Sequence, residues 1–299
     1  MTGRLRDKVA IVTGAARGIG AAVAALFVSE GARVVGVDRQ PVGTSVAGLL
    51  NLTCDVTRPE KVAAAVATTL ERFGRIDVLV NNAGVNVFSA PLELLDSDWD
   101  RCLDVDLKGA WIVSKAVLPA MLAQGSGSIV NIASVHGHQI IPGSFPYPVA
   151  KHGLIGLTRA LGIEYAARGV RVNSISPGFI LTPQAEEWLA AQPDPEKERR
   201  RQQDLLPCKR LGAPEEVAYT ALFLASDEAR FINAADILID GGRTQLYHER
   251  AGRSDAPRAR IDDPVLEVTE SSVLVLQGRG RRVCRGGARG GAMAREPHR

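Results

Sequence analysis

The 299-residue sequence has few cysteines, few aromatic residues and no long apolar run. Its four cysteines, Cys54, Cys102, Cys208 and Cys284, are far apart, which argues against a disulfide framework or a zinc site. No apolar stretch reaches the length of a membrane span, and the first residues lack the pattern of a signal peptide. We therefore expect a globular cytoplasmic protein with reduced thiols and no metal ion.

Neither sign of charge dominates the chain, whose net charge is +3. Residues 251–299 contain ten Arg against six acidic residues, so this segment carries about +4 and the first 250 residues about −1. The nearly neutral body gives no sign of a nucleic-acid groove. The tail is rich in Arg and Gly over residues 279–289 and has no aromatic residue for base stacking, so we interpret 251–299 as a disordered extension rather than an RNA-binding tail.

A glycine-rich segment, residues 13–20, lies between a short apolar run at 9–12 and a helical pattern that continues to Val28. Glycine adopts positive φ and lets the backbone approach a pyrophosphate, whose charge is stabilised by a helix N-terminus. The order of strand, loop and helix favours a nucleotide site over a tight turn without a ligand.

Asp38 follows a second predicted strand, residues 33–37, and is a candidate for binding the adenosine ribose. A carboxylate there accepts hydrogen bonds from both ribose hydroxyls and repels a 2′-phosphate, which favours NAD. Arg17 and Arg39 would attract such a phosphate, so NADP stays the alternative.

Strands alternate with helical patterns along the rest of the first 250 residues, which predicts a parallel sheet covered on both faces. The ligand crevice should lie at the carboxyl ends of the strands, where Asp55 is a candidate for the adenine edge. A helix is predicted over 59–73. The remaining strands are predicted at residues 52–56, 77–80, 127–133, 170–176 and 236–242.

Tyr147 and Lys151 are four residues apart, so on a helix they share one face. A cation within about 4–6 Å favours the phenolate, so we expect the pKa of Tyr147 to fall toward physiological pH. Ser134 would donate a hydrogen bond to a substrate oxygen. We expect Ser144 to cap the helix, which places both prolines that flank Tyr147 in the first turn.

Taken together, these motifs resemble the short-chain dehydrogenase/reductase family over residues 5–247. They are, in the family's order, residues 13–20, Asp38, Asp55, residues 81–84, Ser134, the Tyr147 and Lys151 pair, and Pro177 with Gly178. The resemblance implies one domain, residues 1–250, with a Rossmann-type, doubly wound, seven-stranded parallel sheet. It also implies a bound nicotinamide dinucleotide and a homotetramer or homodimer.

The resemblance also implies residue roles. Tyr147 is the acid or base on the substrate oxygen, Lys151 lowers its pKa and holds the nicotinamide ribose, and Ser134 orients the substrate. The residues expected to bind the dinucleotide are Gly14, Arg17, Gly18, Ile19, Gly20, Asp38, Asp55, Val56, Asn82, Ala83, Gly84, Tyr147, Lys151, Pro177, Gly178, Ile180 and Thr182.

Asp106 departs from the family, which commonly has asparagine at this point in a proton relay that reaches the lysine. Part of that relay uses the main-chain carbonyl, so we expect a perturbed but working relay with Asp106. An added carboxylate close to Lys151 would raise the pKa of the lysine. The alternative is that Asp106 only replaces an amide of the same size.

The substrate is expected to be a polyol, sugar or sugar acid, a secondary alcohol or ketone with many hydrogen-bonding groups. His136 is the main substrate candidate beside Ser134 and Tyr147, and residues 182–209 would form a mobile lid. Further polar candidates are His138, Gln139, Asn86, Ser144 and Gln184. The alternatives are an NADP-dependent 3-oxoacyl reductase and a dinucleotide-sensing or scaffold protein without turnover.

Overall fold

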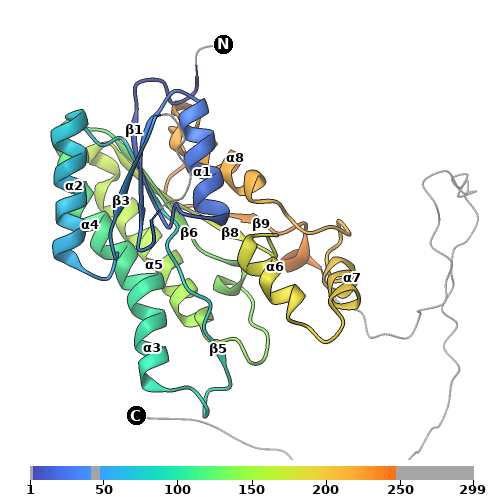
Figure 1. Ribbon diagram of the computed structural model, residues 1–299. Coiled ribbons are helices and arrows are strands. Elements are labelled where there is room, and N and C mark those ends of the chain that lie inside the picture. The colour runs from blue at the N-terminus through green and yellow to red at the C-terminus, as the bar shows by residue number, and fades with distance from the viewer. Residues whose placement is uncertain (1–2, 42–47, 247–299) are drawn as a thin grey trace, which may run out of the picture. The chain divides into compact units, whose positions relative to one another are not determined.

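Seven short runs of mainly apolar residues form one parallel sheet (Figure 1). The computed structural model describes residues 3–41 and 48–246. The strands are β1 (Val9–Thr13), β2 (Arg33–Asp38), β3 (Leu49–Thr53), β4 (Val78–Asn81), β6 (Gly127–Ile132), β8 (Val170–Pro177) and β9 (Asp236–Ile239). They lie in the order β3-β2-β1-β4-β6-β8-β9 with every neighbouring pair parallel, which confirms the predicted doubly wound sheet.

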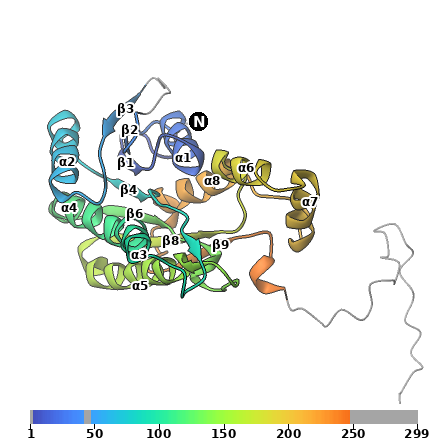
Figure 2. The same cartoon turned by 60° about the horizontal axis from the view of Figure 1, so that its bottom comes forward.

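Helices cover both faces of this sheet, as Figures 1 and 2 show. On one face are α1 (Gly18–Ser29) and α8 (Pro214–Ala225), and on the other are α2 (Pro59–Phe73), α4 (Gly109–Gln124) and α5 (Tyr147–Tyr165). Phe27 of α1 and Met121 of α4 are fully buried in the two cores. Because both faces are covered, every residue of β1 is buried and the strand can be continuously apolar.

Shorter elements surround the carboxyl ends of the strands. Helix α3 (Asp96–Leu103) continues through a π-helical turn, Asp104–Lys108, into α4, and β5 (Phe88–Ser89) pairs antiparallel with β7 (Phe145–Pro146). The segment predicted as a lid contains α6 (Pro183–Ala190) and α7 (Pro195–Leu205). Helix α7 buries none of its residues.

Two predicted strands differ from the structure by more than one residue at an end. The third was expected at 52–56, but β3 ends at Thr53 because its pairing with β2 ends at Asp38. The seventh was expected to reach residue 242, but β9 ends at Ile239. There the Asp240 carboxylate accepts hydrogen bonds from the N–H groups of Gly242, at 2.9 Å, and Thr244, at 2.7 Å, and turns the chain out of the sheet.

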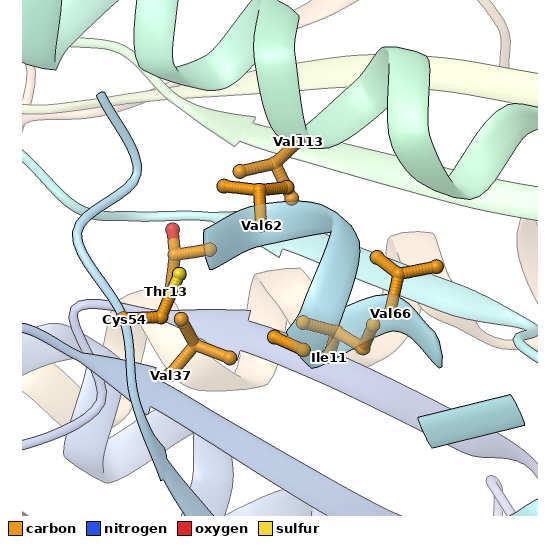
Figure 3. Close-up of a pocket in the computed structure, with 8 residues that line it drawn as sticks. Ile11, Thr13, Val37, Cys54, Val62, Val66 and Val113 are labelled. Atoms are coloured by element: carbon orange, nitrogen blue, oxygen red, sulfur yellow. The ribbon is translucent and has the colours of Figure 1, made fainter. Parts of the chain in front are cut away.

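One small cavity lies between the sheet and helices α2 and α4 (Figure 3). It measures about 10 Å³ and is lined by Ile11, Thr13, Val37, Cys54, Val62, Ala65, Val66 and Val113. A space of this size holds at most about one water molecule, and these side chains are almost all apolar. The cavity is therefore a packing defect of the core and not a ligand site.

Within residues 3–41 and 48–246, no helix combines the length and the apolar character needed to span a bilayer. The predicted disordered extension, residues 251–299, falls outside the part of the chain that the structure describes.

Candidate active site

The glycine-rich loop joins β1 to α1 at the carboxyl edge of the sheet. Gly14 and Gly18 have φ of +66° and +59°, which favours glycine at both positions. A Cβ at Gly20 would lie 2.1 Å from the carbonyl oxygen of Gly14, so the loop closes on itself only without a side chain there. Since α1 begins at Gly18, free N–H groups of its first turn lie in the same loop. This cradle fits a dinucleotide pyrophosphate.

Asn82 fixes this loop to the end of β4. Its Nδ2 donates to the carbonyl oxygens of Thr13, at 3.0 Å, and Gly14, at 3.1 Å. The N–H groups of Asn82 and Ala83 both donate to Thr13 Oγ1, each at 3.0 Å. Asn82 was predicted to contact the cofactor. In the structure its side chain holds the glycine-rich loop in place by hydrogen bonds.

The Asp38 carboxylate lies at the end of β2 against the same loop. It accepts hydrogen bonds from the N–H groups of Ala16, at 3.0 Å, and Gln40, at 2.9 Å, which leaves further acceptor capacity on both oxygens. Arg17 is paired with Glu187 of α6 at 3.3 Å, and Arg39 is exposed. Among the residues described, neither arginine forms an ion pair with Asp38.

Asp55 follows β3 in a short turn, with Val56 buried next to it. Oδ1 of Asp55 accepts hydrogen bonds from the N–H of Thr57, at 2.9 Å, and from Thr57 Oγ1, at 2.7 Å. Partial burial alone would raise the pKa of Asp55, but these hydrogen bonds and the nearby Arg39 hold it below its usual value. The carboxylate therefore stays charged at the strand edge beside Asp38.

The segment after β8 lies beside the glycine loop. Ile180 pairs with Gly212, and Thr182 caps α6 by accepting a hydrogen bond from the N–H of Ala185 at 3.2 Å. A Cβ added to Gly18 would meet Thr182 at 3.4 Å. The structure therefore places the predicted residue Thr182 next to the loop. Pro177 ends β8, and a Cβ on Gly178 would come within 2.9 Å of Asp240 Cα.

Tyr147 is the first residue of α5, and Pro148 is the second. Both lie in the first turn, where N–H groups have no helical partner, so Pro148 leaves the helix intact. The expected cap at Ser144 is wrong. The cap position is Pro146, and Ser144 Oγ instead donates to the carbonyl oxygen of Ile141 at 2.7 Å.

Ser134 and Lys151 lie close to Tyr147, as the sequence predicts. Lys151 Nζ is 5.3 Å from the centroid of the Tyr147 ring and donates to the carbonyl oxygen of Ile132 at 3.2 Å. Ser134, just beyond β6, is buried, and its Oγ accepts a hydrogen bond from the N–H of His136 at 3.1 Å. Its hydroxyl also forms a hydrogen bond with Tyr147 that lowers the pKa of the phenol.

The pKa of Tyr147 differs from the prediction. Burial of the hydroxyl raises this pKa more than Lys151 and Ser134 lower it, and the Asp106 carboxylate raises it further. Lys151 lowers the pKa of Tyr147, as expected. The expected net fall of this pKa is wrong, because the protein's own groups together raise it. Those groups favour a neutral phenol at physiological pH.

Asp106 lies in the π-helical turn, where its carboxylate is buried. Oδ1 accepts a hydrogen bond from the N–H of Val85 at 2.7 Å, and Oδ2 lies 3.3 Å from Lys151 Nζ. Burial alone would lower the pKa of Lys151, but Asp106 and Tyr147 raise it above its usual value. This confirms the expected effect of a carboxylate at this position.

Two rings flank Tyr147. Phe88 of β5 lies edge-on with ring centroids 5.3 Å apart, and His136 lies edge-on at 5.7 Å. His136 was predicted as a substrate residue, whereas Phe88 was missed. Its position depends on the pairing of two-residue strands, in which Phe88 lies opposite Pro146, and such short strands carry no readable alternation.

Three other polar candidates for the substrate bind the protein itself. His138 Nε2 is 2.7 Å from Asp236 Oδ2, and Gln139 Nε2 donates to the carbonyl oxygen of Thr244 at 2.6 Å. Ser144 is bound to Ile141, as described above. These contacts fix the loop after Ser134 and so shape the site. The side chains of Asn86 and Gln184 belong to exposed residues.

Within the described part of the chain, no three His, Cys, Asp or Glu side chains are grouped closely enough to hold a metal ion. The polar groups of the site are those of an acid/base pair beside a dinucleotide cradle. The chemistry they permit is proton transfer to or from a substrate oxygen, coupled to hydride transfer by a bound nicotinamide.

Comparison with known proteins shows which family this chain belongs to. A family model described as enoyl-(acyl carrier protein) reductase matches residues 14–244. D-threitol dehydrogenase of Mycolicibacterium smegmatis is 41% identical over 251 residues, covering 81% of this chain and 94% of that protein. The 3-oxoacyl-[acyl-carrier-protein] reductase of Thermotoga maritima is 40% identical over 248 residues, covering 80% and 98%.

A solved structure agrees with these matches. The aldohexose dehydrogenase of Thermoplasma acidophilum superposes with a TM-score of 0.78 at 35% identity, covering 87% of this chain and all of that one. The chain therefore belongs to the short-chain dehydrogenase/reductase family and is an oxidoreductase of alcohol and ketone groups that uses a nicotinamide dinucleotide.

Proposed function

We propose that the protein is an NAD-dependent secondary-alcohol dehydrogenase or ketoreductase with Tyr147 as its acid/base. The observation that carries this proposal is the convergence of Tyr147, Lys151 and Ser134 at the strand edge that also bears the glycine loop. When bound, NAD supplies or accepts the hydride. Tyr147 gives its proton to the carbonyl oxygen in reduction and takes the hydroxyl proton in oxidation. Ser134 orients that oxygen, and Lys151 stabilises the phenolate.

The choice of NAD over NADP rests on Asp38. Its carboxylate occupies the tip of β2 with acceptor capacity left for ribose hydroxyls, and its charge repels a 2′-phosphate. Arg17 is paired with Glu187, and among the described residues Asp38 has no ion-pair partner. NADP as cofactor would need Arg39 to outweigh this carboxylate.

For the substrate we propose a polyol, sugar or sugar acid. The names of the threitol and aldohexose dehydrogenases support this class. Around Tyr147, the ring of Phe88 presents an apolar surface for the C–H groups of such a molecule. Burial lowers the pKa of His136, and its buried Nδ1 has no hydrogen-bond partner among the described residues. The ring is therefore neutral at physiological pH, and its centroid lies 5.7 Å from that of the Tyr147 ring, where it can contact a substrate.

The alternative substrate is a 3-oxoacyl group reduced with NADP. The similarity to the reductase of Thermotoga maritima favours it. It differs from the leading proposal in cofactor and in the long acyl chain of the substrate, so a single assay with both cofactors separates the two.

We also propose a cytoplasmic homotetramer or homodimer. Large apolar side chains such as Ile163 of α5, which is 73% exposed, and Trp111 of α4 are available for contacts between copies. Light scattering in solution measures this directly, and a monomer at assay concentration would contradict it.

The test follows the absorbance of reduced nicotinamide with NAD and NADP across polyols, sugars, sugar acids and 3-oxoacyl thioesters. We expect turnover with NAD and a polyhydroxy substrate. Tyr147→Phe should abolish turnover and leave NAD binding intact, whereas the matched variant Tyr165→Phe, at the far end of α5, should keep both. Substantial turnover by Tyr147→Phe would remove Tyr147 as the acid/base. Binding without turnover on any substrate would favour the sensing protein.

A further inference from the structure

A buried ion pair lies directly behind the acid/base of this site. The side chains of Asp106 and Lys151 are 0% and 5% exposed, and their charged atoms are 3.3 Å apart. Removing two charges from water is costly unless each has a partner. Lys151, which also lies close to the ring of Tyr147, therefore has a fixed counter-ion supplied by this chain.

In this chain the Asp106 carboxylate meets a donor on each side, and an amide would satisfy only one of them. Oδ1 of Asp106 accepts from the N–H of Val85 and Oδ2 faces the ammonium of Lys151, so both neighbours are donors. An asparagine would turn its NH₂ group toward one of these donors and lose that contact.

The ion pair changes the charge that Tyr147 experiences. The titratable groups around Tyr147 are Lys151 from its own helix, Cys102 and Asp106 from α3 and the π-helical turn, and His136 from the loop after β6. Burial raises the pKa of Cys102 to about 12 and lowers that of His136, so both are neutral at pH 7. Burial raises the pKa of Asp106 above its ordinary value, and Lys151 and the N–H of Val85 offset part of that rise. With Asp106 ionised in its 3.3 Å contact with Lys151, the cluster has no net charge, and without that carboxylate it has a charge of +1.

We propose that Asp106 is a positioning residue that holds Lys151 in this ion pair and keeps Tyr147 a neutral phenol, the form that protonates a carbonyl oxygen. The proposal rests on the function proposed above. Its consequence is that carbonyl reduction finds its acid ready at neutral pH, whereas alcohol oxidation needs a higher pH to form the phenolate.

The first test compares Asp106→Asn with Asp104→Asn. Asp104 lies two residues earlier in the same turn and pairs at the surface with Lys108 at 3.0 Å, so its variant removes the same charge in solvent. We expect the acidic limb of the pH–rate profile for oxidation to move down by at least about one unit in Asp106→Asn, which is about a tenfold faster oxidation on that limb. Asp104→Asn should leave the limb in place. An unmoved limb in Asp106→Asn would overturn the proposal.

The second test needs neither a substrate nor a folded Asp106→Asn protein. The ultraviolet phenolate titration of wild type minus that of Tyr147→Phe isolates Tyr147, and we expect its midpoint above the ordinary value of about 10. A midpoint below that value would overturn the proposal. Absence of turnover by wild type on every substrate would instead count against the proposed function, and this titration would still decide whether Tyr147 is a neutral phenol at pH 7.

Discussion

Gly20→Ala is the sharpest test of how the cofactor loop is built. The new Cβ would lie 2.1 Å from Gly14 O and 2.5 Å from Asn82 Nδ2, so backbone as well as side chain must shift. Such overpacking costs about 1–3 kcal/mol. In a domain of this size, Tm should fall by about 2–4 °C for each kcal/mol. NAD affinity should fall as well, because the displaced segment is the pyrophosphate cradle itself.

Gly156→Ala in α5 is the matched control. No heavy atom lies within 4 Å of the Cβ that it would add, and the position is helical. We expect it to stabilise the protein by about 0.5–1 kcal/mol through helix propensity, with NAD binding unchanged. Thermal unfolding and NAD titration by intrinsic fluorescence measure both variants. A Gly20→Ala protein as stable as wild type, with wild-type NAD affinity, would refute the close packing of this loop.

Three further predictions concern other parts of the molecule. Asp38→Ala should weaken NAD binding by at least about tenfold, since it removes charge-assisted hydrogen bonds to the ribose, and should improve NADP relative to NAD in cofactor titrations; an unchanged preference would contradict the ribose assignment. Asp240→Asn should lower the free energy of unfolding by about 1.5–3 kcal/mol at pH 7. Burial alone would raise the pKa of Asp240, but hydrogen bonds from Thr244 and Gly242 hold it below 3.8. Wild type therefore keeps this stability above pH 3.8 and loses it as the pH falls through the lowered pKa. Urea unfolding should therefore show the difference between the two proteins shrinking in acid, and a pH-independent difference would contradict this. Val66→Ile, which adds one methyl group beside the cavity of Figure 3, should stabilise the protein by up to about 1 kcal/mol, and a lower Tm would show that the added methyl group does not fit there.

The sequence alone determined the elements whose signals are local. Helix α2 runs from Pro59 to Phe73 as predicted, because proline suits its first turn and Gly74, in the left-handed conformation, ends it. The glycine loop and the Tyr147 and Lys151 spacing were equally readable, since each depends on a few consecutive residues. The seven-stranded sheet followed from the alternation of strands and helices.

Only the tertiary structure decided which groups meet across the site. Phe88 reaches Tyr147 through a strand pair that joins distant parts of the chain, and His138 is bound by Asp236, 98 residues away. The sequence suggested a carboxylate near Lys151, but the 3.3 Å contact with Asp106 depends on how the π-helical turn packs against α5. The direction of the pKa shift of Tyr147 could not be predicted from its spacing to Lys151, because burial raises this pKa by more than any single neighbour changes it. Local sequence fixes backbone conformation, whereas burial and charge pairing are set by residues far apart in the chain.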